Sequence, residues 1–262
     1  MVKIKVDPGH GGTDPGAVGN GLREKDLTLT ISKKIRDMLL QYQDVQVSLT
    51  RETDKTLSLK QRTDMANAWG ADFLFSIHIN AGGGTGYEDF RFNKVSVSSR
   101  TAKVQRAIHG SVMVEIKDYN VFDRGAKSAN FHMLRESNMP GVLTENLFID
   151  RAADAKLLKN DKFLDAIARG HVNGLVTAFG LKLKQSEKSN SQKQEDDIMS
   201  QPFNPTSQTI KNSVSTVLSR FEQKDPALSK EWRDKQRDGE LTISDAVGLL
   251  YVAVDRGFIQ GK

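Results

Sequence analysis

The pattern of apolar and polar positions in residues 1–184 alternates between two periods. Apolar residues at every second position predict strands over residues 2–6 and 45–49, each with one buried face. Residues 72–80 (DFLFSIHIN) are apolar on both faces, which is typical of a central strand in a covered sheet. We expect further strands at Tyr87–Asn93, Phe131–Glu136 and Gly141–Phe148.

Helical periodicity fills the intervals between these strands. Apolar residues recur three to four positions apart through residues 27–39, 59–69, 104–116 and 163–175. Strands that alternate with helices predict an α/β domain, with a twisted, largely parallel central sheet and helices on both faces. In such sheets ligands bind beyond the carboxyl ends of the strands.

The composition of the chain changes after Lys184. Residues 185–203 are rich in Ser, Gln, Lys, Glu and Asp, so we predict a polar, flexible linker there. Apolar residues at helical spacing begin again at Ile210 and at Ile243. We therefore expect one main domain, residues 1–184, and a small all-helical C-terminal domain, residues 204–262.

Charge is divided unevenly between these parts. The net charge is +5, and residues 1–184 hold 27 Lys and Arg against 21 Asp and Glu. A basic domain favours an acidic partner, such as nucleic acid, anionic lipid or an acidic wall polymer. The sequence has no basic stripe with interleaved aromatic residues, which argues against nucleic acid. It has no run of 18 apolar residues, so we expect no stable membrane insertion.

Three candidate metal ligands are predicted to gather at one edge of the sheet. His10 lies in a glycine-rich loop after the first strand, Glu24 begins the first helix, and His78 ends the central strand. The chain has no cysteine, so a metal must be held by histidines and carboxylates. Two imidazoles and one carboxylate leave the fourth position of a tetrahedral zinc site for water. The alternatives are structural histidines and a glutamate that only complements the helix dipole.

Glu145 interrupts the apolar run MPGVLTENLFID. A buried carboxylate without a partner is energetically costly, so some group must compensate its charge. A metal-bound water would do so, with Glu145 as general base. The alternative is a glutamate that faces solvent through simple strand alternation.

Three segments of the chain carry a resemblance to a known family. DPGHGGTDPGAVGNGLREKDLTL, SLKQRTDMANAWGADFLFSIHINAGGGTGYE and VLTENLFID closely resemble the zinc-dependent N-acetylmuramoyl-L-alanine amidases of bacterial cell-wall lysis. The resemblance covers residues 2–180, and the chain looks most like Bacillus-type sporulation and mother-cell lysis amidases and phage endolysins. It implies a single catalytic zinc on His10, Glu24 and His78, with Glu145 as the catalytic carboxylate.

The same resemblance implies the substrate. These enzymes hydrolyse the amide between the lactyl group of N-acetylmuramic acid and L-alanine in peptidoglycan, using zinc-activated water. Anionic wall polymers are further expected partners. The N-terminus lacks the apolar core of a signal peptide, so we expect synthesis in the cytoplasm and release by a holin or by mother-cell lysis. From its position, the helical domain 204–262 is expected to target the enzyme to the wall.

Two other functions stay open. Another zinc peptidoglycan peptidase or carboxypeptidase would share the metal chemistry. A His-x-x-Glu pair is absent at the first ligand, however, because Thr13 stands three residues after His10. A catalytically inactive wall-binding protein would keep the fold, but all four reactive positions are filled.

The remaining polar residues of these segments have simpler interpretations. Asn80 lies two residues beyond His78 and binds substrate, binds a ligand or caps the backbone. His109 and His171 fall in helical patterns and are expected to be surface or packing residues. We assign no role to His132.

One segment of the helical domain partly matches a calcium loop. Asp234–Asp245 has acidic or amide residues at EF-hand positions and a glycine at the sixth position. Gln236 and Asp245 depart from the pattern at positions 3 and 12. We therefore favour an ordinary polar connection over a Ca²⁺ site.

Overall fold

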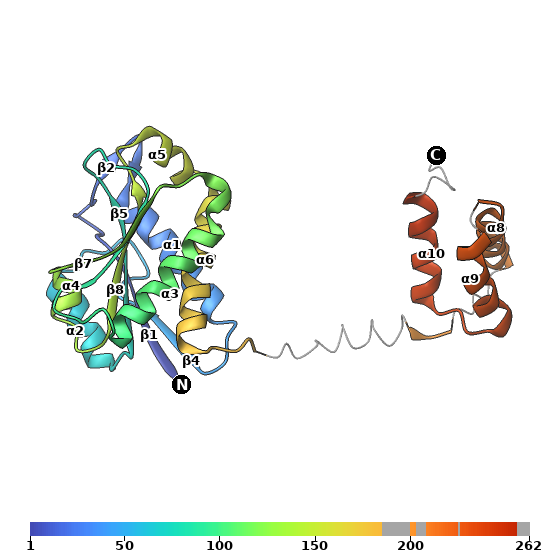
Figure 1. The fold of residues 1–262 in the computed structure, drawn as a ribbon, viewed down its shortest axis with the longest axis horizontal. Coiled ribbons are helices and arrows are strands. Elements are labelled where there is room, and N and C mark those ends of the chain that lie inside the picture. Colours follow the sequence, from blue (N-terminus) through green and yellow to red (C-terminus); the bar gives the residue numbers. More distant parts are fainter. Residues whose placement is uncertain (185–199, 203–207, 225, 256–262) are drawn as a thin grey trace. The chain divides into compact units, whose positions relative to one another are not determined.

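The chain folds into two compact units, Met1–Lys184 and Gln185–Lys262 (Figure 1). The structure, a computed structural model, describes residues 1–184, 200–202, 208–224 and 226–255. The predicted linker at 185–203 lies outside the described residues except for 200–202, so it stays a prediction.

A six-stranded sheet forms the centre of the first unit, in the order β4-β1-β5-β8-β6-β7. All neighbouring strands are parallel except β6 and β8. The strands are β1 (Val2–Pro8), β4 (Val45–Leu49), β5 (Phe73–Asn80), β6 (Tyr87–Phe92), β7 (Asp123–Ala129) and β8 (Gly141–Phe148). A separate antiparallel pair consists of β2 (Val18–Gly19) and β3 (Leu22–Arg23).

Helices cover both faces of this sheet (Figure 1). On one face lie α1 (Glu24–Leu39), α3 (Arg100–Glu115) and α6 (Asp161–Phe179), and on the other lie α2 (Leu59–Trp69) and α4 (His132–Arg135). A 3-10 helix (Lys117–Tyr119) follows α3, and α5 (Ala152–Leu158) precedes α6. The predicted α/β architecture with a largely parallel sheet is confirmed.

The central strand β5 supplies side chains to two separate apolar clusters. Phe73 and Phe75 are fully buried in the main core, which includes residues of α1, α3 and α6. Leu74 points to the opposite face and packs with Ala66 of α2 and Met133 of α4. Both faces of the strand are therefore apolar because both are covered by helices.

The prediction of a strand at Phe131–Glu136 is wrong. These residues contain the one-turn helix α4, which buries the adjacent residues Met133 and Leu134 together. The strand at the β6 side of the sheet is instead the edge strand β7, whose sequence DRGAKSA has no large apolar residue. An edge strand pairs on one side only and is partly exposed, so it needs no continuous apolar pattern.

The second unit is helical, as predicted. It contains α8 (Gln208–Lys224), α9 (Pro226–Asp238) and α10 (Ile243–Asp255). Leu218, Phe221 and Leu249 are buried together, with Trp232 of α9 packed against them. Helix α9 was not predicted, because its sequence is mostly charged and its apolar stripe is short. No helix in the described ranges is long and apolar enough to cross a membrane.

The segment Asp234–Asp245 does not form a calcium loop, which corrects the partial motif match. Asp234 and Gln236 lie inside α9, so the first ligand positions are helical and cannot wrap around an ion. Asp245 instead takes part in the cap of α10: its carboxylate accepts from the Thr242 backbone N–H at 3.0 Å, and its own backbone N–H donates to the Thr242 hydroxyl at 3.1 Å. The Asp245 carboxylate also pairs with Lys235 at 3.1 Å. This segment is therefore the ordinary polar connection between helices that we favoured over a Ca²⁺ site.

Helices α3 and α6 approach each other closely at two glycines of α6. A Cβ atom added at Gly174 would lie 2.4 Å from the Ile108 Cα atom, and one at Gly170 would lie 2.6 Å from the Val112 Cα atom. These contacts are to backbone atoms, which cannot rotate away. The two glycines therefore set the distance between the helices that carry much of the main core.

We predict that Gly174→Ala lowers the free energy of unfolding by about 1–3 kcal/mol, because the added methyl group overpacks this contact. Urea denaturation measures the change. The matched control is Gly110→Ala in α3, where no atom lies within 4 Å of the added Cβ. That variant should gain about 0.5–1 kcal/mol of helix propensity. Equal stability of the two variants would contradict the close contact.

Candidate functional site

Three side chains converge at the carboxyl ends of β1 and β5. These strands are parallel neighbours with Pro8 opposite Ile77, so the loop residue His10 comes to lie beside His78. Glu24, the first residue of α1, reaches between them: Oε2 lies 3.2 Å from His10 Nε2 and Oε1 lies 3.0 Å from His78 Nδ1. The three ligand atoms all lie within 4.8 Å of one another. The structure thus brings together the residues predicted as metal ligands.

The residues fit a zinc ion in both chemistry and space. Two imidazole nitrogens and a carboxylate oxygen are ligands that zinc prefers. The loop backbone passes so close to these side chains that a Cβ atom added at Gly9 would lie 2.4 Å from the His78 ring. One at Gly16, which has a φ of +66°, would lie 2.6 Å from Glu24 Oε2. Glycine at these positions leaves room for the three ligands, which explains the glycine-rich loop around His10.

Further hydrogen bonds fix the orientation of the candidate ligands. Glu24 Oε2 accepts from the Ala17 backbone N–H at 2.8 Å, and Oε1 accepts from the Ile79 backbone N–H at 3.0 Å. His10 Nδ1 lies 2.8 Å from an Asp14 carboxylate oxygen. A carboxylate on the second ring nitrogen orients a metal-binding imidazole and makes it more basic.

Glu24 controls the charge of this cluster. Burial would raise the pKa of Glu24, but hydrogen bonds from His10 and His78 and their charges hold the pKa well below its usual range. Burial would likewise lower the pKa of His10, yet the contacts with Glu24 and Asp14 raise it to about 9. The Glu24 side chain is therefore an ionised carboxylate removed from water, which favours a bound cation.

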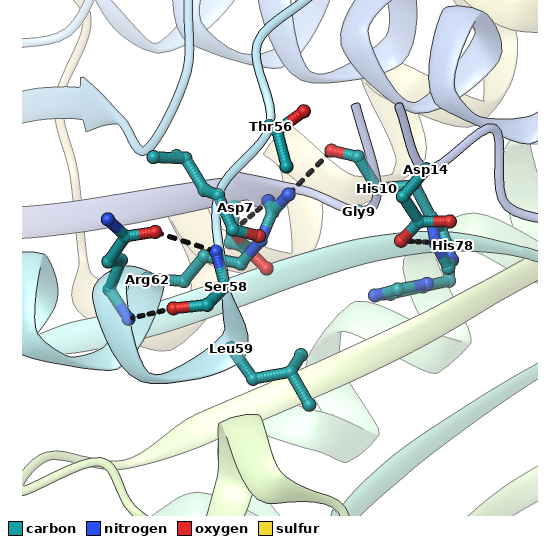
Figure 2. A pocket seen from close by; sticks show the side chains of 11 residues that line it. Asp7, Gly9, His10, Asp14, Thr56, Ser58, Leu59, Arg62 and His78 are labelled. Carbon is teal, nitrogen blue, oxygen red and sulfur yellow. Dashed lines mark hydrogen bonds and ion pairs between the residues drawn. The ribbon is translucent and has the colours of Figure 1, made fainter. Parts of the chain in front are cut away.

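Two buried arginines hold the loop that carries His10. Arg62 donates to the carbonyl oxygen of Pro8 at 2.6 Å and to that of His10 (Figure 2). Arg51 donates to the carbonyl oxygens of Pro8 at 3.1 Å and Gly9 at 2.9 Å. Three consecutive carbonyl groups are thus fixed, and His10 is held in a left-handed conformation with a φ of 58°.

Asp7 balances the charge of Arg62. Its carboxylate is fully buried, lies 2.9 Å from the guanidinium group, and accepts from Thr50 at 2.6 Å and Ser76 at 2.8 Å. Burial would raise the pKa of Asp7, but the charge of Arg62 and the hydrogen bonds from Thr50 and Arg62 lower it. This pair was not predicted, although a charged residue at the buried end of a strand is a signal for one.

Glu145 lies next to the cluster on the neighbouring strand. It is opposite His78 in the β5–β8 pairing and opposite Glu88 in the β6–β8 pairing. Its side chain is half-buried, and Oε2 is buried without a hydrogen-bond partner. Burial raises the pKa of Glu145 to about 7, although the nearby charge of His78 lowers it. Glu145 is therefore not a fully solvent-facing residue.

Glu88 was not predicted as part of this region either. This carboxylate is 4% exposed and accepts from Asn80 Nδ2 at 2.7 Å. It also forms ion pairs with Arg124, at 3.0 Å, and with Lys127. Asn80 therefore contacts Glu88, and its Oδ1 accepts from the Ala81 backbone N–H, so its side chain has a structural role.

The other histidines lie outside the cluster. His171 is fully buried in α6 between Ile167 and Thr144, and burial lowers its pKa to about 4. His109 of α3 bridges two carboxylates of β6 and β7, Asp89 and Asp123. Both are packing residues, as expected.

A cavity of about 420 Å³ opens on one side of the histidines (Figure 2). Its far wall consists of residues 56–59, Gln61 and Arg62, around the start of α2. Ser58 caps this helix in a reciprocal capping box with Gln61. The cavity thus opens beside His10 and His78, on the side of α2.

We predict that Arg62→Met destabilises the protein by about 3–5 kcal/mol, because it leaves the Asp7 carboxylate buried without a counterion. Chemical denaturation measures this loss. Lys60→Met on the same helix is the control, since its ion pair with Asp64 is exposed and contributes about 0–1 kcal/mol. A stable Arg62→Met variant would contradict the role of Arg62 in holding the loop.

Comparison with known proteins identifies the family. Residues 4–177 match the family model of N-acetylmuramoyl-L-alanine amidases. The chain is 53% identical to the N-acetylmuramoyl-L-alanine amidase CwlM of Bacillus licheniformis, over 69% of this chain and 70% of the relative. It is 46% identical to the endolysin of Bacillus phage SPP1, over 69% of this chain and 67% of that protein.

A solved structure agrees with this match. The N-acetylmuramoyl-L-alanine amidase from Clostridium difficile 630 is 35% identical, with a TM-score of 0.65 over 68% of this chain and 97% of that chain. The fold, the cluster of candidate ligands and the sequence matches agree with the resemblance found in the sequence. The chain belongs to the N-acetylmuramoyl-L-alanine amidase family.

Proposed function

We propose that residues 1–184 hydrolyse the amide between N-acetylmuramic acid and L-alanine with one zinc ion on His10, Glu24 and His78. The observation that carries this proposal is the position of Glu145. Its unpartnered oxygen belongs to the residue paired with His78 on the adjacent strand. A proton acceptor beside a metal-binding group is what metal-assisted hydrolysis requires.

The chain's own residues divide the chemistry between them. When bound, the zinc ion supplies Lewis acidity for the substrate carbonyl and acidifies water. Glu145 accepts a proton from the attacking water as the oxygen bonds to the carbonyl carbon. It then donates this proton to the departing nitrogen as the C–N bond breaks, which yields a carboxylate and a free amine. The raised pKa of Glu145 suits both steps near neutral pH.

The amidase reaction fits better than the two alternatives. A zinc carboxypeptidase would share the ligands, but the family match and the curated relatives favour amide cleavage at the muramic acid. An inactive wall-binding protein has no need of three converging ligands with oriented hydrogen bonds.

The proposed substrate determines where the protein acts. One relative is a sporulation-specific amidase of Bacillus subtilis, 52% identical, and another is the phage endolysin. We propose that this protein likewise acts on bacterial peptidoglycan after release from the cytoplasm, and that anionic wall polymers attract its basic first unit. We further propose that the helical second unit binds the wall.

We predict that two variants separate metal binding from chemistry. His78→Ala removes a ligand, so the purified protein should lose most of its zinc in elemental analysis. Glu145→Gln keeps the shape but removes the base. It should keep about one zinc per chain while wall hydrolysis falls at least about 100-fold. Full zinc in His78→Ala, or wild-type hydrolysis by Glu145→Gln, would contradict the corresponding assignment.

We predict that a chain ending at Lys184 stays folded and active, because the first unit has its own core and contains all four reactive residues. It should sediment less with purified cell walls than the full chain, since a tethered binding unit raises the local enzyme concentration. Co-sedimentation and hydrolysis of a small soluble substrate are measured side by side. Equal sedimentation of both chains would contradict wall targeting by residues 185–262.

A further inference from the structure

Charged side chains form a row across four neighbouring strands, and only part of this row is used by the proposed mechanism. His78 of β5, Glu145 of β8 and Glu88 of β6 are opposite one another in the strand pairings. At the end of the row, Arg124 and Lys127 of β7 reach Glu88. The metal-ligand cluster and the proposed base thus continue into a pair of cations on the edge strand.

This pair of cations carries more charge than Glu88 balances. Glu88 is one carboxylate, it contacts both cations, and Asn80 also donates to it. The three charged groups together have a net charge of +1. The Lys127 side chain is 39% exposed and that of Arg124 is 28% exposed, whereas the Glu88 side chain is 5% exposed. The surplus positive charge therefore faces solvent at the β7 end of the row.

The positions of the two cations are fixed by their contacts. Arg124 stacks on the ring of Phe148, with its guanidinium carbon 4.9 Å from the ring centroid. Glu88 draws the Lys127 ammonium group toward β6. An ammonium group has three N–H donors, and the contact with Glu88 uses one of them. The pair is thus a preorganised group of donors with capacity for an anionic ligand.

The proposed reaction gives the substrate a direction along this row. The departing nitrogen must lie within reach of Glu145, which donates a proton to it. The row of charged side chains offers the peptide that begins at this nitrogen a path from Glu145 toward the cations that reach Glu88 of β6. The sugar on the other side of the cleaved bond extends toward the cavity beside α2, lined by residues 56–59.

The distances agree with this direction. Adjacent strands lie about 4.7–4.9 Å apart, so β6 and β7 lie about 5 and 10 Å from β8. An extended peptide spans at most about 3.3–3.6 Å per residue, so a group on the residue after L-alanine lies about 7 Å from the departing nitrogen. A side chain on that residue therefore comes within reach of the ammonium and guanidinium groups.

We propose that Arg124 and Lys127 bind a carboxylate of the stem peptide, carried by the residue that follows L-alanine. This inference rests on the proposed function, because the direction of the peptide depends on the role of Glu145. The two cations then select substrates in which this carboxylate is free over substrates in which it is a carboxamide.

The test uses the full chain and two disaccharide-peptide substrates that differ in one group. The residue after L-alanine carries a free carboxylate in one substrate and a carboxamide in the other. The wild-type kcat/KM should be at least about tenfold higher for the carboxylate, as a charge-assisted hydrogen bond provides. Lys127→Met should lower this ratio toward one, and Lys127→Arg should retain most of it.

Lys34→Met is the matched control. Lys34 also pairs with carboxylates, those of Asp161 and Asp165, but it belongs to α1 and is not part of the row. It should leave the ratio at the wild-type value. A wild-type ratio near one would overturn the proposal, as would a Lys127→Met variant that loses activity on both substrates in parallel with an unchanged ratio. Cleavage of neither substrate by the wild-type enzyme would instead refute the proposed function itself.

Discussion

Two buried guanidinium groups turn a glycine-rich loop into a rigid support for His10. Arg51 and Arg62 are each 3% exposed, and together they donate to three consecutive loop carbonyl groups. A loop without regular structure must find donors for its buried carbonyl groups, and here side chains provide them. Burying a guanidinium group costs free energy, and Asp7 offsets this cost by pairing with Arg62 inside the protein. The position of the first metal-ligand candidate depends on this network.

The remaining geometry follows from the sheet. Parallel pairing of β1 and β5 brings the loop beside His78, and Glu24 enters from the start of α1 to contact both histidines. The next strand, β8, supplies Glu145 on the same side as His78. The loop contributes His10, the helix contributes Glu24, and the two strands contribute His78 and Glu145. These elements are held in place by the packing of the main core. A rigid site keeps reacting groups oriented at little entropic cost.

Much of the fold was predictable because the apolar periodicity is strong where helices cover the sheet. The central strand 73–80 and the strand 141–148 are buried on both faces and were recognised from their apolar runs. The prediction failed where burial is weak or short. The edge strand Asp123–Ala129 has little apolar content, and the adjacent pair Met133 and Leu134 looked like strand although one helical turn buries both. Helix α9 was missed for the same reason, since a surface helix can be almost entirely charged.

Residue type and local position were enough to identify the residues that can bind a metal. The chain has no cysteine, and it places histidines at the ends of two buried strands and a glutamate at a helix start, so His10, Glu24 and His78 were found from residue type and local position. The groups around these residues depend on how distant segments pack. Strand β8 lies between β5 and β6 in the sheet, although it follows both in the sequence. Glu145 therefore lies between His78 and Glu88. Arg124 and Lys127 join the row only because β7 pairs with β6. Such juxtapositions depend on strand order and register, which arise from packing between distant segments and leave no signal in the local sequence.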